Sequence, residues 1–250
     1  MQNNVFQKSV IMIGLVAATL WMYSCSDESI KADDVNFGFE YFPITSTKTL
    51  IYVSDSIIYD GSPNRVDTFR GYIREKIGES IILPNGQIVN KVERSFKRDL
   101  ADPWVRTNTW TTYIENTKGV RIEENIPLIK LVFPFKKGTK WNGNALMDDK
   151  IEIKAGGQTF KMYEDWKYEV LNDEASFTIN GVSYPSVVVT NVKDSSIFEL
   201  RDVQETYAKD LGLVSKSMRI YLGDGSLPNE KWEKKASKGF RHTLRLIDIR

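Results

Sequence analysis

Two of the Asn-Gly dipeptides constrain the fold of this chain more than any other feature of its sequence. Asn-Gly favours the tight turn of a β-hairpin, because both central residues of that turn need a positive φ. The dipeptides are Asn85-Gly86, between residues 78–83 and 87–96, and Asn180-Gly181, between residues 175–179 and 182–192. The sequence therefore predicts two antiparallel hairpins, one in each half of the chain.

Other segments also have the composition of β-strands. Residues 49–59 are rich in β-branched and aromatic residues. Residues 104–114 contain four threonines and two tryptophans, which favour a strand over a helix. The run Val187-Val188-Val189 indicates a strand buried on both faces. The closing stretch, 242–249, alternates apolar and charged residues, and we expect it to be the last strand.

The same landmarks occur twice, in the same order, at offsets of 91 to 95 residues. The paired landmarks are Phe42-Pro43 with Phe133-Pro134, Asn85-Gly86 with Asn180-Gly181, and Thr112-Tyr113 with Thr206-Tyr207. This pattern predicts two tandem units, 37–130 and 131–250, that pack as one body. The alternative is coincidence among common turn dipeptides.

Two stretches have competing interpretations. Leu200, Val203, Tyr207 and Leu211 have helical spacing, with Gly212 in the place of a helix terminator. Their counterpart in the first unit is the threonine-rich stretch, so we expect a strand; residues 91–100 are similarly ambiguous. Only residues 229–238 are left as a short helix. The fold class is therefore mainly β, an antiparallel sandwich or partly closed barrel of about ten to twelve strands.

The first 25 residues have the organisation of a secretory signal. Lys8 precedes an apolar run from Val10 to Tyr23, which is shorter than the roughly 20 residues of a membrane-spanning helix. The run ends in Met22-Tyr23-Ser24-Cys25, which resembles the lipobox of a bacterial lipoprotein. The resemblance implies a signal peptide over 1–24 and acylation of Cys25. A buried cysteine and an uncleaved N-terminal anchor are the alternatives.

Charge and cysteine usage narrow the class of protein. Residues 25–36 have the composition of a flexible acidic tether, with four acids and one lysine. Cys25 is the only cysteine, so no internal disulfide can form. Without residues 1–24 the chain has 33 basic residues, since Lys8 is lost from 34, against 33 acidic ones. A nucleic-acid partner is not expected, because such proteins normally carry a basic excess.

Few chemistries are supported by the residue types present. His242 is the only histidine and lies among arginines, so it indicates a solvated or structural residue and not a catalytic one. Metal sites built on His and Cys are excluded by counting, and Asp148-Asp149 does not follow the spacing of a calcium loop. We expect no metal, no cofactor and no enzymatic activity. A glycoside hydrolase with two carboxylates is a distant alternative, because no pair among 33 acids stands out.

One strand carries a candidate ligand site. In a regular strand, the period of two places Trp104, Arg106, Asn108 and Trp110 on one face. Two indole rings with hydrogen-bonding groups between them form a platform for a sugar or another planar ligand. The alternative, which we favour because large aromatic side chains are usually buried, is that both tryptophans belong to the core.

Four stretches carry a resemblance to a known family: the signal ending in Cys25, residues 40–43 (EYFP), residues 133–144 (FPFKKGTKWNGN) and residues 207–214 (YAKDLGLV). With these stretches the chain resembles a family of Bacteroidetes cell-envelope lipoproteins with no known activity. The acidic residues after Cys25 also resemble an export signal to the outer face of the outer membrane, although a solvated linker has the same composition. The resemblance implies an outer-membrane protein anchored by its N-terminal lipid. The periplasmic or cell-surface side and the oligomeric state stay open.

These observations favour a lipid-anchored, non-catalytic binding or scaffolding module for a glycan, a peptide or a protein of the envelope. The alternative is a carrier that holds a small apolar ligand inside a curved sheet. A filled interior favours the module, whereas an empty apolar cavity favours the carrier.

Overall fold

Antiparallel strands make up most of the computed structural model, which describes residues 36–60, 66–155 and 158–250. The predicted signal peptide, Cys25 and the tether as far as residue 35 lie outside the described residues. Residues 37–250 form a unit with its own core, and this unit is described here by itself. Within the described residues, no helix is long and apolar enough to cross a membrane.

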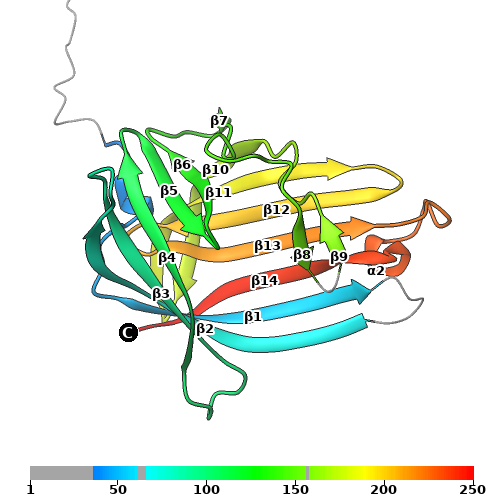
Figure 1. Ribbon diagram of the computed structural model, residues 1–250, viewed down its shortest axis with the longest axis horizontal. Helices are drawn as coiled ribbons and strands as arrows, with labels where there is room; N and C mark the ends of the chain where they lie inside the picture. Colours follow the sequence, from blue (N-terminus) through cyan, green and yellow to red (C-terminus); the bar gives the residue numbers. More distant parts are fainter. Residues whose placement is uncertain (1–35, 61–65, 156–157) are drawn as a thin grey trace, which may run out of the picture. The chain divides into compact units, whose positions relative to one another are not determined.

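One antiparallel sheet contains twelve strands (Figure 1). They are β1 Thr49–Asp60, β2 Val66–Ile82, β3 Ile88–Lys97, β4 Val105–Glu115, β5 Lys118–Glu123, β6 Ile126–Val132, β7 Lys140–Trp141, β10 Tyr168–Ile179, β11 Val182–Ser195, β12 Glu199–Ala208, β13 Gly212–Leu222 and β14 Lys238–Ile249. A separate hairpin consists of β8 Ile153–Ala155 and β9 Gln158–Phe160. The helical segments of the described chain are the 3₁₀ turn η3, Phe39–Tyr41, and the single turn α2, Trp232–Lys235.

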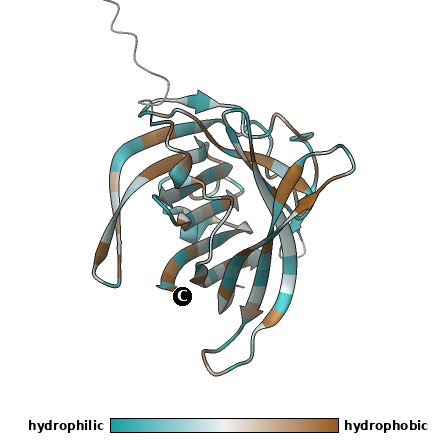
Figure 2. Cartoon of the chain, turned by 90° about the vertical axis from the view of Figure 1, so that its left-hand side faces the viewer, coloured by the Kyte–Doolittle hydropathy of each residue, from teal (hydrophilic) through white to brown (hydrophobic). Residues whose placement is uncertain are grey.

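The strand order is β6-β5-β4-β3-β2-β1-β14-β13-β12-β11-β10-β7. The sheet thus consists of two meanders joined where the first strand pairs with the last. It curls until its two ends meet (Figure 2). The Trp141 indole N–H donates to the Ile129 carbonyl at 2.8 Å, and the Ile129 N–H donates to the Gly143 carbonyl at 2.8 Å. The prediction of a mainly β, antiparallel fold is confirmed, and of its two architectures the structure has the nearly closed barrel.

The ambiguous stretches are strands. Leu200 to Tyr207 lies in β12, residues 91–97 lie in β3, and the threonine-rich stretch forms β4. In β12 the inward side chains of Val203 and Tyr207 belong to the core, and Leu200 near its start is buried as well. Together these apolar positions have the spacing that suggested a helix. The predicted helix over 229–238 is reduced to the one turn of α2.

The two Asn-Gly turns differ from one another. Asn180 and Gly181 both have positive φ, 52° and 77°, and join β10 to β11 as predicted. Between β2 and β3, Gly86 has a φ of 83° and its N–H donates to the Leu83 carbonyl at 2.8 Å. Pro84 occupies the second position of that turn, where its fixed φ favours an ordinary β-turn. The loop there is longer than the predicted two-residue hairpin turn.

The landmarks of the predicted duplication occupy matching places in the two meanders. The Asn-Gly turns join β2 to β3 and β10 to β11, and the Thr-Tyr pairs lie in β4 and β12. Any long antiparallel meander repeats such an order, however, so the tandem duplication and its boundaries stay a prediction.

Two segments cover parts of the concave face of the sheet. The first, residues 37–48, is the N-terminal segment. Its Phe42 ring packs so closely against Gly119 that a Cβ atom on this glycine would lie only 2.8 Å from the ring. The second is the connection between β7 and β10, which contributes Phe160, Met162, Tyr163 and Trp166 to the main core. The concave face is thus filled by side chains over β10–β13 and less completely elsewhere.

Candidate functional site

The four residues of the predicted platform do not share one face. The register between β3 and β4 shifts between the pairs Arg94–Asn108 and Ser95–Arg106, so Thr107 is an extra residue in β4. Such a bulge reverses the alternation of side chains beyond it. Arg106 therefore lies on the convex face and donates to Glu93 and Thr109, at 3.0 Å each.

The two tryptophans are correspondingly separated. Trp104 precedes β4 and lies beneath the cations of Arg74 and Lys97, at 4.9 and 4.8 Å from its ring centroid. Asn108 and Trp110 lie on the concave face and both donate to Glu124. Both tryptophans are half-buried, so neither the shared platform nor full burial in the core is found.

A buried carboxylate is held between two arginines next to Trp110. Glu75 accepts a hydrogen bond from Arg94 Nε at 2.8 Å and another from Arg121 Nη2 at 2.6 Å. Both guanidinium groups also lie over the Trp110 ring, at 3.7 and 4.9 Å. Burial acts to raise the pKa of Glu75, but the charges of Arg121 and Arg94 outweigh it and lower the pKa. We call Glu75, Arg94 and Arg121 the arginine cluster.

A second buried carboxylate is held between two lysines. Glu205 lies 2.6 Å from the Lys130 ammonium and 3.2 Å from that of Lys216. It also accepts hydrogen bonds from the Asn191 amide at 3.2 Å and the Tyr207 hydroxyl at 2.7 Å. Burial acts to raise the pKa of Glu205, but the two lysines hold it far below its usual range. We call Lys130, Glu205 and Lys216 the lysine cluster.

Glu123 joins the two clusters. Its Oε1 lies 3.8 Å from Arg121 Nε and 3.6 Å from the Lys130 ammonium. Burial acts to raise its pKa, but Lys130 and Lys216 outweigh it and hold the pKa at about 2. The connected chain has four cations and three carboxylates, a formal charge of +1 inside the fold.

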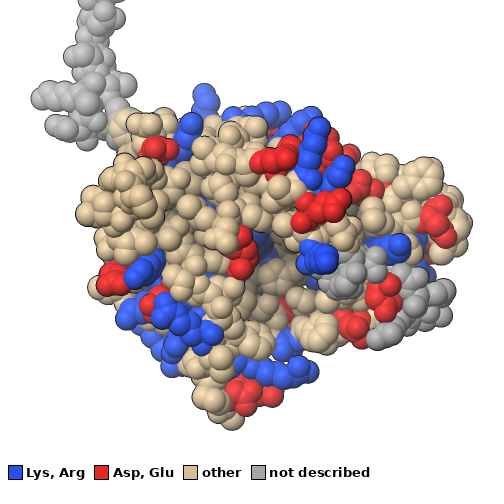
Figure 3. Space-filling view, viewed as in Figure 1, with Lys and Arg blue, Asp and Glu red and all other residues tan. Residues whose placement is uncertain are grey.

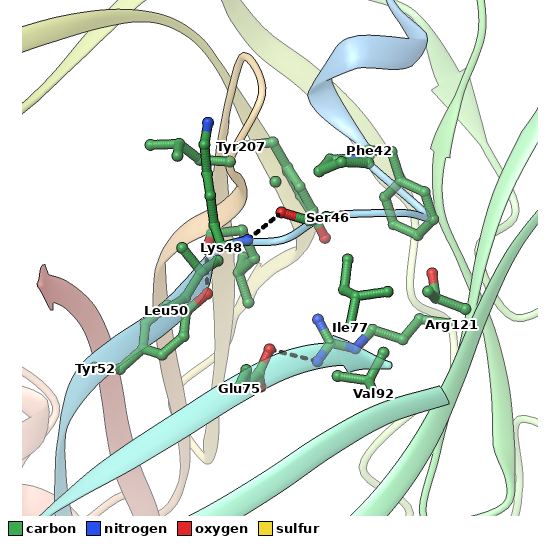
Figure 4. Close-up of a pocket in the computed structure, with 15 residues that line it drawn as sticks. Phe42, Ser46, Lys48, Leu50, Tyr52, Glu75, Ile77, Val92, Arg121 and Tyr207 are labelled. Carbon is green, nitrogen blue, oxygen red and sulfur yellow. Dashed lines mark hydrogen bonds and ion pairs between the residues drawn. The ribbon is translucent and has the colours of Figure 1, made fainter. Parts of the chain in front are cut away.

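A small cavity lies between the arginine cluster and the N-terminal segment (Figure 4). Its walls include Phe42, Tyr52, Glu75, Arg121 and Tyr207. Its volume of about 50 Å³ suffices for a few water molecules. Pockets for small molecules usually measure roughly 300–1,000 Å³, so this cavity is too small to hold a ligand.

The concave face is less covered over one part of β1, β2 and β14, where Ser54, Ser56 and His242 are half-buried and Phe69 is exposed. Residues paired across these strands on this face are Ser54 with Gly71, Ser56 with Phe69, and Ser56 with His242. Phe69 and Phe96 are 45% and 39% exposed. The Phe96 ring lies over Gly71, and a Cβ atom on Gly71 would be only 2.3 Å from that ring. The surface is hollowed between β4 and β8, in front of β13 and β14 (Figure 3). We call the concave-face residues Ser54, Ser56, Phe69, Phe96 and His242, which belong to β1, β2, β3 and β14, the open hollow.

His242 is part of the open hollow. Its Nε2 shares a hydrogen bond of 3.1 Å with Ser54 Oγ. Burial lowers the pKa of His242 to about 4, and the charges of Lys216 and Arg94 act in the same direction. The imidazole is therefore neutral and weakly basic at neutral pH. Its place in the interior corrects the reading of a solvated residue and agrees with a structural one.

Sequence reasoning missed all seven charged residues of the buried chain. One signal was present in β6, where Lys130 stands alone among the apolar residues of IPLIKLV. Another was in β12, where Glu205 alternates with Val203 and Tyr207 on the inward face.

Comparisons with known proteins add little to this geometry. No protein-family model matches the chain, and no curated protein matches its sequence. A candidate exported protein with a YmcC-like fold from Bacteroides fragilis matches 86% of this chain and 100% of its own, with a TM-score of 0.42 and 11% identity. A candidate lipoprotein from Parabacteroides distasonis matches 87% of this chain and 100% of its own, with a TM-score of 0.39 and 11% identity. Similarities this weak carry no argument about function.

Proposed function

We propose that this chain is a lipid-anchored protein of the outer membrane that binds a ligand, without catalysis, in its open hollow. The single observation that carries the binding site is the pair of exposed rings, Phe69 and Phe96, on the otherwise core-forming face of the sheet. Apolar groups exposed on a concave surface are typical of a binding site. The anchor is supported by the lipobox-like sequence that ends in Cys25.

The interior favours a binding module over an enclosed carrier. The concave face over β10–β13 is filled by the β7–β10 connection, and the cavity beside the arginine cluster has room only for water. This filled interior supports binding in the open hollow over binding inside a closed chamber.

The buried carboxylates also count against a glycoside hydrolase. That chemistry needs one carboxylic acid that keeps its proton near neutral pH. Glu75, Glu123 and Glu205 all have lowered pKa values, because each is surrounded by cations. None of the three can serve as the acid.

The test uses the full chain extracted from the membranes of cells that express it. Mass spectrometry of the N-terminal peptide is expected to find acylated Cys25 as the first residue, and Cys25→Ala is expected to abolish the modification. Native mass spectrometry is expected to find a co-purifying ligand. Ser56→Trp fills the hollow and is expected to remove that ligand.

Ser217→Trp is the matched control, because Ser217 lies on the opposite face of the sheet from Lys216 and lines a convex groove. It is expected to keep the ligand. An unmodified Met1 would refute the anchor. Equal ligand content in the two tryptophan variants, both shown to be folded by circular dichroism, would refute the site.

A further inference from the structure

The open hollow lies next to an uncompensated positive charge. The buried chain of seven ionic side chains has one more cation than it has carboxylates. Its two ends, Arg94 and Lys216, are both cationic. Charges in a poorly solvated interior are attracted to an opposite charge far more strongly than they are in water.

Both end cations have unused hydrogen-bond donors. Arg94 donates through Nε to Glu75, and among the described residues no group accepts a hydrogen bond from its Nη atoms. Within the described part of the chain, Lys216 has one ionic partner, Glu205, at 3.2 Å. A guanidinium group with free Nη donors is suited to a carboxylate or a phosphate.

These cations lie beside the Ser54–His242 pair. Lys216 pairs with Leu244 across β13 and β14, which makes it the diagonal neighbour of His242 on the concave face. Arg94 is placed by Phe96, its neighbour on the same face of β3, whose ring lies over Gly71 opposite Ser54. The charges of Lys216 and Arg94 both act to lower the pKa of His242, in addition to its burial. Ser54 supplies a hydroxyl at the same place.

The apolar part of the hollow adjoins this polar end. Phe69 pairs with Ser56, and Ser56 pairs in turn with His242 on the next strand. The Phe96 ring lies over Gly71, directly beside Ser54 on the neighbouring strand. Phe96 is thus two residues from Arg94 on the same face of β3, and Phe69 lies two strands away from His242.

We propose that the open hollow binds an amphipathic anion, with its carboxylate or phosphate between Arg94, Lys216 and Ser54–His242, and its hydrocarbon part on Phe69 and Phe96. This inference rests on the proposed function, because it names the chemical class of the ligand for the same site. A fatty acid and a lipid phosphate both have this chemistry.

His242 is the only histidine, so its nuclear magnetic resonance signal reports on this site alone. The acylated full chain is held in nanodiscs of zwitterionic phospholipid and titrated with decanoate, decyl phosphate or neutral decanol. A bound anion is expected to raise the pKa of His242 by roughly one unit or more, because it offsets the nearby cations. Decanol is expected to leave that pKa unchanged. A larger effect of decanoate or of decyl phosphate distinguishes a fatty acid from a lipid phosphate.

The hydrocarbon contact is tested by Phe69→Ser, an exposed position whose change leaves the core intact. It is expected to weaken binding of decanoate about tenfold or more without altering the effect of acetate at high concentration. Phe198→Ser removes a ring outside the hollow that is 55% exposed, against 45% for Phe69, and is expected to leave binding unchanged.

An unmoved pKa of His242 at saturating anion would overturn the inference, as would equal effects of decanoate and decanol. A neutral co-purifying ligand that Ser56→Trp displaces would also overturn it, while leaving the proposed function standing. If both tryptophan variants keep the co-purifying ligand, the proposed function itself is contradicted.

Discussion

The arginine cluster and the lysine cluster are built alike but are enclosed to different degrees. In each, a glutamate lies directly opposite a cation on the next strand, Arg94 for Glu75 and Lys216 for Glu205. Glu205 has four partners and no exposed surface, and Lys130 is 2% exposed. Glu75 has two partners, and the side chain of Arg94 is 12% exposed.

The difference lies in how completely each carboxylate is enclosed and in which hydrogen-bond donors around it stay unused. The carboxylate of the lysine cluster has its acceptors used within the fold, as a buried ion pair requires. The arginine cluster borders the small cavity, and its guanidinium groups keep donors unused. Arginine is suited to this place because it can stack on Trp110 and bind a carboxylate at the same time.

The largest expected effect comes from breaking the lysine cluster. Glu205→Gln leaves the Lys130 ammonium buried with only Glu123, at 3.6 Å, as a negative partner. Removing one member of a buried ion pair typically costs about 3–5 kcal/mol, because the other charge is left without compensation. Urea unfolding followed by circular dichroism measures the loss. Glu93→Gln, which breaks an exposed pair with Arg106, is expected to cost less than about 1 kcal/mol.

His242 in the open hollow and the carboxylates of the two clusters are expected to affect the free energy of unfolding in different pH ranges. The pKa of His242 is about 4 in the folded protein against 6.5 for an ordinary histidine, so the unfolded chain binds a proton first as the pH falls. Stability is therefore expected to decrease by about 3 kcal/mol between pH 6.5 and pH 4. The carboxylates have lowered pKa values, so their contribution is present above about pH 4.5 and is lost only at lower pH.

The groups that act on His242 come from four strands: Lys216 of β13, Arg94 of β3, Asp55 of β1 and Glu123 of β5. His242→Gln keeps a hydrogen-bonding side chain next to Ser54 and removes the titration. Free energies of unfolding measured from pH 7 to pH 4.5 are expected to stay level in this variant. The same decline in both proteins would show that another group titrates.

A smaller effect is expected at the arginine cluster. Glu75→Gln removes the charge that Arg94 and Arg121 share, but both guanidinium groups keep Trp110 and reach water at their edges. The expected loss is about 2 kcal/mol, the usual range for hydrogen bonds to charged groups. The comparison of the two clusters is wrong if urea unfolding shows this variant to be less stable than Glu205→Gln.

The strands were predictable because their signals are local. Threonine and tryptophan in β4, valine in β11 and the turn at Asn180-Gly181 act over a few residues. The closure of the sheet was not predictable, since it depends on Ile129 meeting Trp141 and Gly143 through a curl that accumulates over twelve strands.

The candidate site was harder to predict for two physical reasons. The bulge at Thr107 turns Arg106 to the other face, and no local pattern marks it. The partner of Lys130 is 75 residues away, so the unusual lysine in β6 could be noticed but its ion pair could not be assigned. The position of the open hollow depends on which loops and connections cover the concave face, and this is decided only when the chain folds.

The pairing of β1 with β14 has a consequence for the order in which the chain folds. Within each meander the backbone pairing joins strands that are neighbours in the sheet, and such pairings can form early because they close short loops. The seam in the middle of the sheet needs the last residues of the chain, and the Thr49 and Arg250 backbones bond to each other at its end. The barrel therefore stays divided into two halves until β14 has been synthesised, and its final step is one long-range strand pairing.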